Sequence, residues 1–326
     1  MSITSQPVII LVLLIGGLII LWASSKLTIG SATKVSLETG LSETNVGFLL
    51  LAFTTSVPEL VITVISSSSG AVDLAMGNII GSNVANIGII IGAPFLILRF
   101  TRQKTSDPIT MSSIELRDIF SGLLVASAIP LFLIIWPLSF RPIGGLLLIS
   151  YILISYLMVR GSKRSTIHQG EGDRSILIKA SLTLLLGIAG VILSSALIVS
   201  SAVSMASSLG ISQTIIGATI IAVGTSLPEL AISISAVWSK HRELALGNAV
   251  GSCFANITIV LGTLLLISPI KIIPMDFLNQ IAFTLLMNIF LFTFVFRKRL
   301  GGWESTSLII LYVLFTITTL EISLPL

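Results

Sequence analysis

Two glutamates set in apolar sequence are the residues of this chain whose chemistry most needs an explanation. Glu59 lies in the hexapeptide TSVPEL, and Glu229 lies in the hexapeptide TSLPEL, 170 residues further along the chain. A second motif follows each hexapeptide at the same distance, as GNIIGSNVAN in the first copy and GNAVGSCFAN in the second. Between residues 55–92 and 225–262, 18 of 38 aligned pairs are identical without a gap. The chain therefore contains an internal repeat built around two carboxylates.

Hydroxyl and amide oxygens accompany both glutamates at matched positions. Ser82 precedes Asn86 by four residues, which puts both side chains on one face of a helix, and the second copy repeats this spacing. Two carboxylates among neutral oxygens suit a hard cation such as Ca²⁺ or Na⁺, and protons are the alternative compensator. Transition metals are disfavoured, because His168 and His241 lie in predicted loops and Cys253 has no second thiol. The candidate side-chain ligands besides the glutamates are Thr55, Ser56, Ser82, Asn86, Thr225, Ser226, Ser252 and Asn256.

The composition indicates that these motifs lie in a membrane protein. Hydrophobic residues make up 54% of the chain, charged residues make up only 10%, and the mean hydropathy is +1.07. Soluble domains carry about 25% charged residues, so a soluble globule is excluded. Apolar runs long enough to cross a bilayer core of about 30 Å recur along the whole chain. We predict ten spans, at 7–25, 44–69, 74–98, 116–136, 140–159, 177–205, 212–238, 244–268, 277–296 and 305–324.

The basic residues are distributed unevenly among the predicted loops. Of the 18 Lys and Arg residues, 16 lie in or beside the loops that follow odd-numbered spans. Cytoplasmic loops retain Lys and Arg, so both termini are predicted to be extracellular, with the odd loops inside the cell. The basic excess therefore reflects topology, and nucleic-acid binding is disfavoured because no basic patch with interleaved aromatic residues occurs. The expected location is the cell (plasma) membrane, which the chain crosses several times.

The two motif copies lie in spans 2 and 3 and in spans 7 and 8, so they enter the bilayer from opposite sides. Inverted repeats of this kind build the ion sites of secondary transporters. We therefore expect an all-α integral membrane protein with ten transmembrane helices in two inverted five-helix repeats. The expected parts are a first repeat at 1–159 with its motif at 46–92, a cytoplasmic linker at 160–176, and a second repeat at 177–326 with its motif at 216–262.

Both repeats carry residues that are expected to interrupt a membrane helix. Pro58 and Pro228 lack an N–H and clash with the preceding turn, which frees carbonyl oxygens just before each glutamate. A carboxylate at the centre of a bilayer costs about 2.5 to 3.5 kcal/mol, so two at matched positions indicate a function. Matched glycines are expected to loosen the partner helices, at Gly77, Gly81, Gly247 and Gly251.

At these residues the chain resembles a known family. The paired TS(V/L)PEL and GNxxGSxxAN segments are similar to the two alpha-repeats of the cation/calcium exchanger superfamily, most closely its prokaryotic sodium/calcium exchanger branch. The resemblance implies the sodium/calcium exchanger fold and alternating access, with spans 1 and 6 sliding past an eight-span core. It implies that Glu59 and Glu229 bind Ca²⁺ together with the carbonyls of Thr55 and Thr225. It further implies flanking Na⁺ sites at Ser56, Ser82, Ser226, Ser252 and the carbonyls of Ala52 and Ala222, with Asn86 and Asn256 at the middle position.

The expected function is secondary active exchange of Na⁺ for Ca²⁺ across the membrane. Potassium-dependent and some archaeal members of the superfamily have Asp where this chain has Asn256. Proton-coupled members usually carry an acidic residue shortly after the Gly-Asn of the second motif, where this chain has only apolar residues and glycine. These differences favour Na⁺ as the coupling ion, and a proton-coupled or potassium-dependent antiporter is the alternative.

Two other classes of protein are weighed against the antiporter. A passive cation channel binds ions weakly along an open pore, whereas two central carboxylates favour a tight, occluded site. The predicted spans contain no HExxH, no Ser-His-Asp set and no Cys-His pair, so the chain is not expected to be an enzyme. No cofactor is expected. The expected partners are Ca²⁺ and Na⁺, with H⁺ as the alternative, and the lipid bilayer, and a monomer is the expected unit.

Overall fold

The computed structural model describes residues 7–68, 70, 72–100, 111–135, 141–165, 173–208, 224, 226–268 and 274–323. Within these residues every regular element is an α-helix or a short π-helical segment, and there is no strand. Helices coincide with all ten predicted spans, although the first half of the seventh span lies outside the described residues. The predicted all-α membrane fold is therefore confirmed.

The helices differ in whether they run without a break. Those that do are α1 (Pro7–Thr39), α7 (Ser113–Ile135), α8 (Arg141–Ser165), α9 (Arg174–Ser208), α15 (Pro274–Phe296) and α16 (Gly302–Ser323). Of the seventh span, the described part is mainly α12 (Leu227–Trp238). The second span comprises α2 (Glu43–Val46), η2 (Gly47–Leu51), α3 (Ala52–Thr55) and α4 (Val57–Ser68). The third comprises α5 (Val72–Ala85), η3 (Asn86–Ile91) and α6 (Gly92–Phe100), and the eighth comprises α13 (Arg242–Ala255), η5 (Asn256–Val260) and α14 (Leu261–Ile267).

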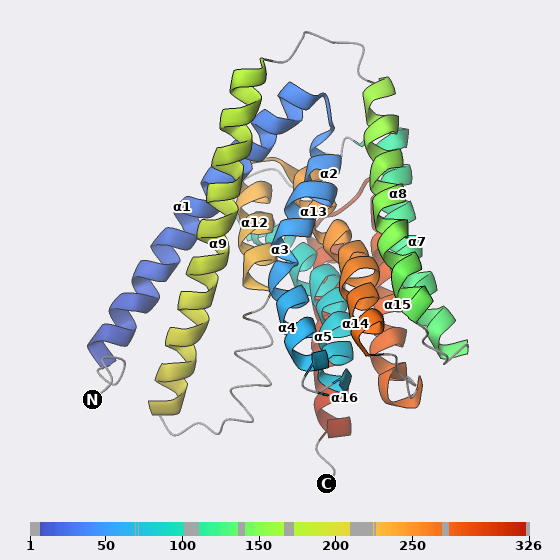
Figure 1. Ribbon diagram of the computed structural model, residues 1–326. Helices are drawn as coiled ribbons and strands as arrows, with labels where there is room; N and C mark the ends of the chain where they lie inside the picture. Colours follow the sequence, from blue (N-terminus) through green and yellow to red (C-terminus); the bar gives the residue numbers. More distant parts are fainter. Residues whose placement is uncertain are drawn as a thin grey trace.

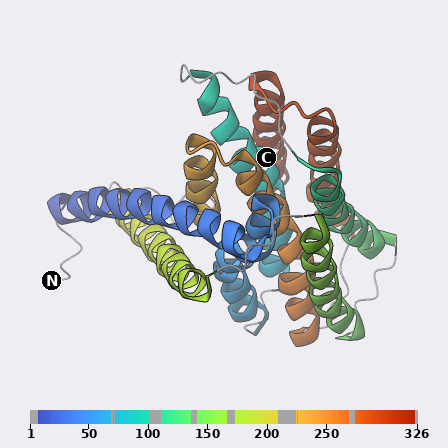
Figure 2. The ribbon, with the colours of Figure 1, turned by 90° about the horizontal axis from the view of Figure 1, so that it is seen from above.

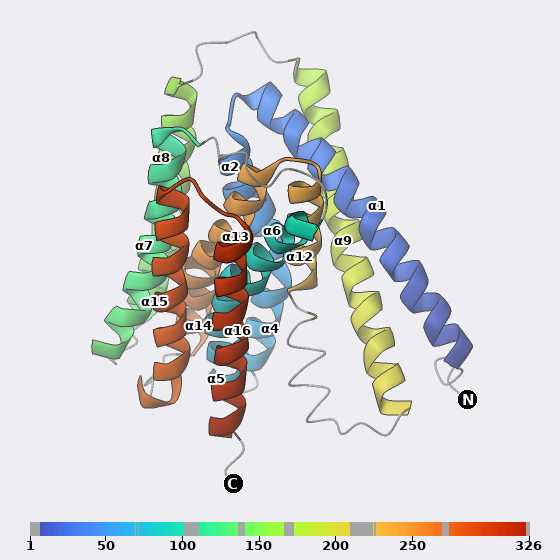
Figure 3. The same cartoon turned by 180° about the vertical axis from the view of Figure 1, so that it is seen from behind.

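The helices are suited to repeated crossing of a membrane. Among the described residues, 7 helical stretches are long and apolar enough to do so. The start of α1 and the end of α16 lie at the same end of the bundle, as an even number of crossings requires (Figure 1). Seen from behind, α15 and α16 pack beside each other against the central helices (Figure 3).

The two longest helices, α1 and α9, form a tilted pair beside the rest of the molecule. They contain 33 and 35 residues, whereas about 20 residues suffice to cross a bilayer. They pack along each other and project from one side of the remaining helices (Figure 2). Lys26 and Lys34 therefore lie on α1 and not in a loop, which corrects the predicted end of the first span. Similarly, α8 and α9 extend into both ends of the predicted linker at 160–176.

Both glutamate-bearing helices follow a backbone break at an equivalent serine. Ser56 separates α3 from α4 with ψ of 5°, and Ser226 precedes α12 with ψ of 6°. The following proline occupies the first turn of the new helix, where its missing N–H removes no intrahelical bond. The predicted interruption ahead of each glutamate is confirmed.

The partner helices are interrupted by π-helical segments and not at their glycines. Segments η3 and η5 begin at Asn86 and Asn256, the last residue of each copy of the second motif. The prediction that the glycines loosen these helices is wrong, because all four lie within the α-helices α5 and α13. A Cβ atom at Gly247 or Gly251 would collide with the backbone of α2 and η2. These two glycines therefore permit close packing of α13 on the second span.

The turns that close the two motif hairpins share one backbone conformation. Gly70, between α4 and α5, has φ of 82°, and Lys240, between α12 and α13, has φ of 70°. In both turns this residue donates its N–H to the carbonyl three residues earlier, at 3.2 Å. The turns lie at opposite ends of the bundle, as expected for repeats of opposite orientation (Figure 1).

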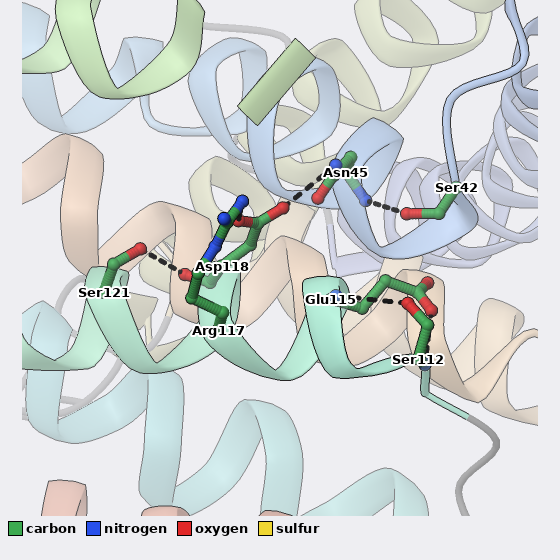
Figure 4. A network of polar contacts seen from close by, with 7 residues as sticks. All are labelled: Ser42, Asn45, Ser112, Glu115, Arg117, Asp118 and Ser121. Atoms are coloured by element: carbon green, nitrogen blue, oxygen red, sulfur yellow. Dashed lines mark hydrogen bonds and ion pairs between the residues drawn. The ribbon is translucent and has the colours of Figure 1, made fainter. Parts of the chain in front are cut away.

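Polar contacts tie α2 to the start of α7 at one end of the bundle (Figure 4). Asn45 donates a side-chain N–H to Asp118 at 3.2 Å, and Arg117 forms an ion pair with the same carboxylate at 3.2 Å. Ser112 and Glu115 form a reciprocal cap at the start of α7, with N–H contacts of 2.8 and 3.3 Å. Charged residues at this end thus serve the helix ends and their packing.

A second contact at the same helix ends involves His241, which the sequence suggests to be a solvated loop residue. Its ring Nδ1 lies 2.8 Å from Oε1 of Glu43, so the residue before α13 contacts the first residue of α2. The His241 side chain is only 29% exposed, which corrects the expectation of a fully solvated histidine.

Candidate ion-binding site

The two glutamates occupy equivalent places, each in the first turn of a helix that follows a break. Glu59 lies in α4 and Glu229 lies in α12, with only 2% and 1% of their surfaces exposed. Their carboxylates lie close enough to interact electrostatically, and the Thr55 side chain is within hydrogen-bonding reach of Glu229. The fold therefore brings the duplicated carboxylates together in the interior.

Both carboxylates lie at helix starts, and no ion pair between described residues joins either of them to a basic side chain. The first turn of a helix favours negative charge, because its free N–H groups and macrodipole point toward it. The ion pairs between described residues are Arg117 with Asp118 and His241 with Glu43, and neither includes Glu59 or Glu229. Two buried carboxylates without a basic partner are well suited to a cation.

Several buried polar atoms around the glutamates have no hydrogen-bond partner. Buried polar groups are nearly always paired, because burying an unpaired one costs several kcal/mol. A group of such atoms from both repeats therefore points to a ligand, and oxygen atoms of this kind are the ligands of Ca²⁺ and Na⁺. The unpaired atoms on predicted site residues are Oε2 of Glu59, Oε2 of Glu229, Oγ of Ser56, Oγ of Ser252 and Oδ1 of Asn256.

The remaining predicted site residues in the described part of the chain are also buried. Ser82 and Asn86 lie at the junction of α5 and η3, which packs against α12 and α13, and Ser226 lies at the break before α12. The Thr55 hydroxyl donates to Leu51 O at 3.0 Å, and the Ala52 carbonyl accepts the N–H of Ser56 at 3.1 Å. Ala222 and Thr225 lie outside the described residues.

Additional polar residues that are not among the predicted ligands line the same region. Asn83 is fully buried and accepts a hydrogen bond from Asn256 at 3.1 Å across the two repeats. Asn248 donates to Ser233 at 3.4 Å, one turn beyond Glu229, and keeps an unpaired oxygen. Asn248 and Ser233 could have been found from the sequence, because the first repeat has the polar residues Asn78 and Thr63 at the matched positions. The repeat gives no such indication for Asn83, because Cys253 stands at the matched position of the second copy.

Comparison with known proteins agrees with this arrangement. The family model described as sodium/calcium exchanger protein matches residues 9–160 and 179–320. The chain belongs to the sodium/calcium exchanger family. The resemblance that the two motifs show to this family is therefore confirmed.

Individual relatives align over most of the chain. The sodium/calcium exchanger MaX1 of Methanosarcina acetivorans is 29% identical, over 94% of this chain and 97% of its own. The inner membrane protein YrbG of Escherichia coli K12 is 31% identical, over 88% of each chain. A structure of the sodium-calcium exchanger NCX_Mj soaked with 10 mM Na⁺ and zero Ca²⁺ superposes with a TM-score of 0.84 at 25% identity, covering 97% of this chain and 100% of that one.

Membership of the sodium/calcium exchanger family decides the broad class of the protein. It is a multi-pass membrane protein that transports cations as an antiporter, and it is not an enzyme.

Proposed function

We propose that the protein is a secondary active antiporter that exchanges Na⁺ for Ca²⁺ by alternating access, around a central site at Glu59 and Glu229. The observation that carries this proposal is the pair of neighbouring, buried carboxylates surrounded by unpaired oxygens from both repeats. Two negative charges match one Ca²⁺ ion, and neutral oxygens complete the six to eight ligands that Ca²⁺ takes. The names of MaX1 and NCX_Mj support the same pair of ions.

The proposed ligands divide into a central and a flanking set. Glu59 and Glu229 bind Ca²⁺ with the carbonyls of Thr55 and Thr225, and Asn86 and Asn256 occupy the middle position between the repeats. The flanking Na⁺ sites use Ser56, Ser82, Ser226, Ser252 and the carbonyls of Ala52 and Ala222. One chain supplies all of these groups, so a monomer is sufficient for exchange.

Competition between the two ions follows from the charge of this site. The two carboxylates carry two negative charges, which one Ca²⁺ ion neutralises. Na⁺ ions that bind as well would add positive charge that no carboxylate balances, so occupancy by one kind of ion weakens binding of the other. A passive channel lacks this requirement, because it conducts through several weak sites in an open pore. The competition supplies the coupling between inward and outward flux.

The proposed orientation places both termini outside the cell and the exchanger in the cell (plasma) membrane. Most Lys and Arg residues lie at the opposite side, in or beside the connections that follow odd-numbered spans. These include Lys240 in the turn between α12 and α13, whereas the matched turn between α4 and α5 carries Gly70.

Flux measurements in sealed proteoliposomes test the proposal. Ca²⁺ uptake should require an outward Na⁺ gradient and should continue against a Ca²⁺ gradient when that Na⁺ gradient is steep. If an imposed pH gradient drives uptake without Na⁺, the coupling ion is H⁺ and not Na⁺. A requirement for K⁺ would point to the potassium-dependent class. Uptake that only follows the Ca²⁺ gradient would overturn the antiport proposal.

A further inference from the structure

One hydrogen bond at the site crosses from the second repeat to a residue of the first that has no proposed contact with ions. Asn256, the first residue of η5, donates its side-chain Nδ2 to Oδ1 of Asn83 on α5 at 3.1 Å. Both side chains are buried, with 1% and 0% of their surfaces exposed. The bond therefore persists without competition from solvent.

This bond determines which end of the Asn256 amide remains available. A side-chain amide has donor hydrogens at its nitrogen and acceptor lone pairs at its oxygen, so fixing one end fixes the direction of the other. The nitrogen of Asn256 is engaged by Asn83, while its Oδ1 is buried and has no hydrogen-bond partner. A cation accepts ligation from an oxygen and is repelled by an N–H₂ group, so the free end is the one that suits it.

The residue of the second repeat that matches Asn83 cannot hold the Asn86 amide in the way that Asn83 holds the Asn256 amide. Cys253 replaces Asn83 there, and a thiol has no amide oxygen with which to accept a strong hydrogen bond. Instead the Cys253 sulfur lies 3.7 Å from the backbone oxygen of Asn83 and interacts with the Asn86 side chain. The two middle amides of the site are therefore held by different partners.

We propose that Asn83 is a positioning residue that holds the Asn256 amide with its oxygen toward the bound cation. This inference rests on the proposed function, because it assumes that a hard cation lies between the repeats. Asn83 itself contacts no ion and acts only through Asn256. It makes position 256 an oriented, neutral ligand, which an amide free to rotate would not be.

A double-mutant cycle separates this role from a purely structural one. Asn83→Leu removes the acceptor with little change in volume, and Asn256→Ala removes the group that Asn83 positions. In the parent protein, Asn83→Leu should raise the Ca²⁺ concentration that gives half-maximal uptake about tenfold and should change the maximal rate less. The reason is that the buried Nδ2 of Asn256 loses its acceptor, so the Asn256 oxygen is no longer held toward the cation. In the Asn256→Ala variant, Asn83→Leu should change the half-maximal Ca²⁺ concentration less than about twofold, because no Asn256 side chain remains to be positioned.

Equal effects of Asn83→Leu in both backgrounds, or a change confined to maximal rate, would overturn the inference. Asn83→Ser is the second variant if the leucine variant does not fold. Asn45→Leu is the matched control: it removes another fully buried amide, bonded to Asp118 away from the glutamates. It should lower the thermal midpoint and leave the half-maximal Ca²⁺ concentration unchanged.

A binding measurement distinguishes failure of this inference from failure of the proposed function. The thermal midpoint of each purified variant is recorded against Na⁺, Ca²⁺, K⁺ and pH, because a ligand that binds the folded state raises it. If neither Na⁺ nor Ca²⁺ stabilises the parent protein, the proposed function has failed, and the cycle is repeated with the cation that does stabilise it. If no cation stabilises the parent protein, both fail. If the Asn83 effect is independent of Asn256 with every stabilising cation, the positioning role alone is wrong.

Discussion

At the scale of single residues, the site depends on carboxylates that are costly in any other role. A central carboxylate in a membrane costs about 2.5 to 3.5 kcal/mol, and this chain carries two with no basic partner among the described residues. Their helix-terminal positions offset part of that cost. In the function proposed above, a bound cation offsets the remainder and supplies the partner that the unpaired oxygens lack.

Glu59→Gln and Glu229→Gln are therefore each expected to abolish Ca²⁺ exchange. Each change removes one charge at nearly constant volume, and loss of one partner from a buried charge pair costs about 3–5 kcal/mol, so uptake should fall at least about a hundredfold. Sodium-dependent ⁴⁵Ca²⁺ uptake into proteoliposomes measures the effect. Glu304→Gln is the control, because Glu304 caps the start of α16 and glutamine can retain that contact. Near-normal uptake in either glutamate variant would remove that carboxylate from the site.

At the scale of helices and turns, the duplication is visible in backbone geometry as well as in sequence. The breaks at Ser56 and Ser226 and the turns at Gly70 and Lys240 have matched dihedral angles. Of these two hairpin turns, the one at Lys240 imposes a left-handed conformation on a residue with a Cβ atom, whereas the one at Gly70 does not. That conformation costs a non-glycine residue about 1–2 kcal/mol.

Lys240→Gly is expected to stabilise the protein by about 1 kcal/mol, because glycine adopts a positive φ without steric cost. The Lys240 side chain is exposed, so its removal costs little packing. The thermal midpoint in detergent should rise. The reciprocal change, Gly70→Lys, should lower it by a similar amount. If neither variant changed the thermal midpoint, the left-handed conformation of these turns would not affect stability.

Gly247→Ala is expected to destabilise the protein by about 1–3 kcal/mol, since an added methyl group would force α13 away from the second span. Its Cβ would collide with the backbone at Thr44, which cannot move independently of the helix. Gly30→Ala is the control, because Gly30 is exposed on α1 and a Cβ there meets no described atom within 4 Å. An equal thermal midpoint for the Gly247 variant and the parent would contradict the close packing.

The sequence predicts the helix breaks but not the π-helical segments. Proline is disfavoured inside a helix because it lacks an N–H and clashes with the preceding turn, so Pro58 and Pro228 indicate the breaks from the sequence alone. The π-helical turns at Asn86 and Asn256 depend on the packing of several helices, which no local pattern records. The contact between Asn83 and Asn256 joins residues 173 positions apart, and its asymmetry hides it from a comparison of the two repeats.

At the scale of the whole molecule, α1 and α9 lie to one side of the core that carries the candidate site and contact it mainly through α12. They contact each other along their length, and Ser31 of α1 donates to Thr183 of α9 at 3.0 Å. Between α1 and α12 lies a cavity of about 500 Å³, lined in part by Trp22 and Trp238. This arrangement suits a pair of helices that moves as one body past a core, as the proposed alternating access requires.

Cross-linking within the pair and cross-linking of the pair to the core should therefore have opposite effects. In Ser31→Cys/Thr183→Cys the introduced thiols replace side chains that lie 3.0 Å apart, so oxidation to a disulfide should join α1 to α9 without a reagent having to reach the buried position 31. Exchange should continue, because α1 and α9 move together. In Trp22→Cys/Trp238→Cys a short thiol-specific cross-linker should join α1 to α12 across the cavity and stop Na⁺-driven Ca²⁺ uptake. The native Cys253 is fully buried and need not be replaced.

The reagent-free activity of each double variant provides the reference, because only the change on cross-linking reports movement. The Trp22 and Trp238 side chains are 67% and 55% exposed, so the introduced thiols should be accessible. Sustained exchange after complete α1–α12 cross-linking would show that α1 does not move relative to α12 during transport. Arrest by the α1–α9 cross-link alone would show instead that the two long helices move relative to each other, and the sliding-pair mechanism would have to be replaced by one in which each helix moves separately.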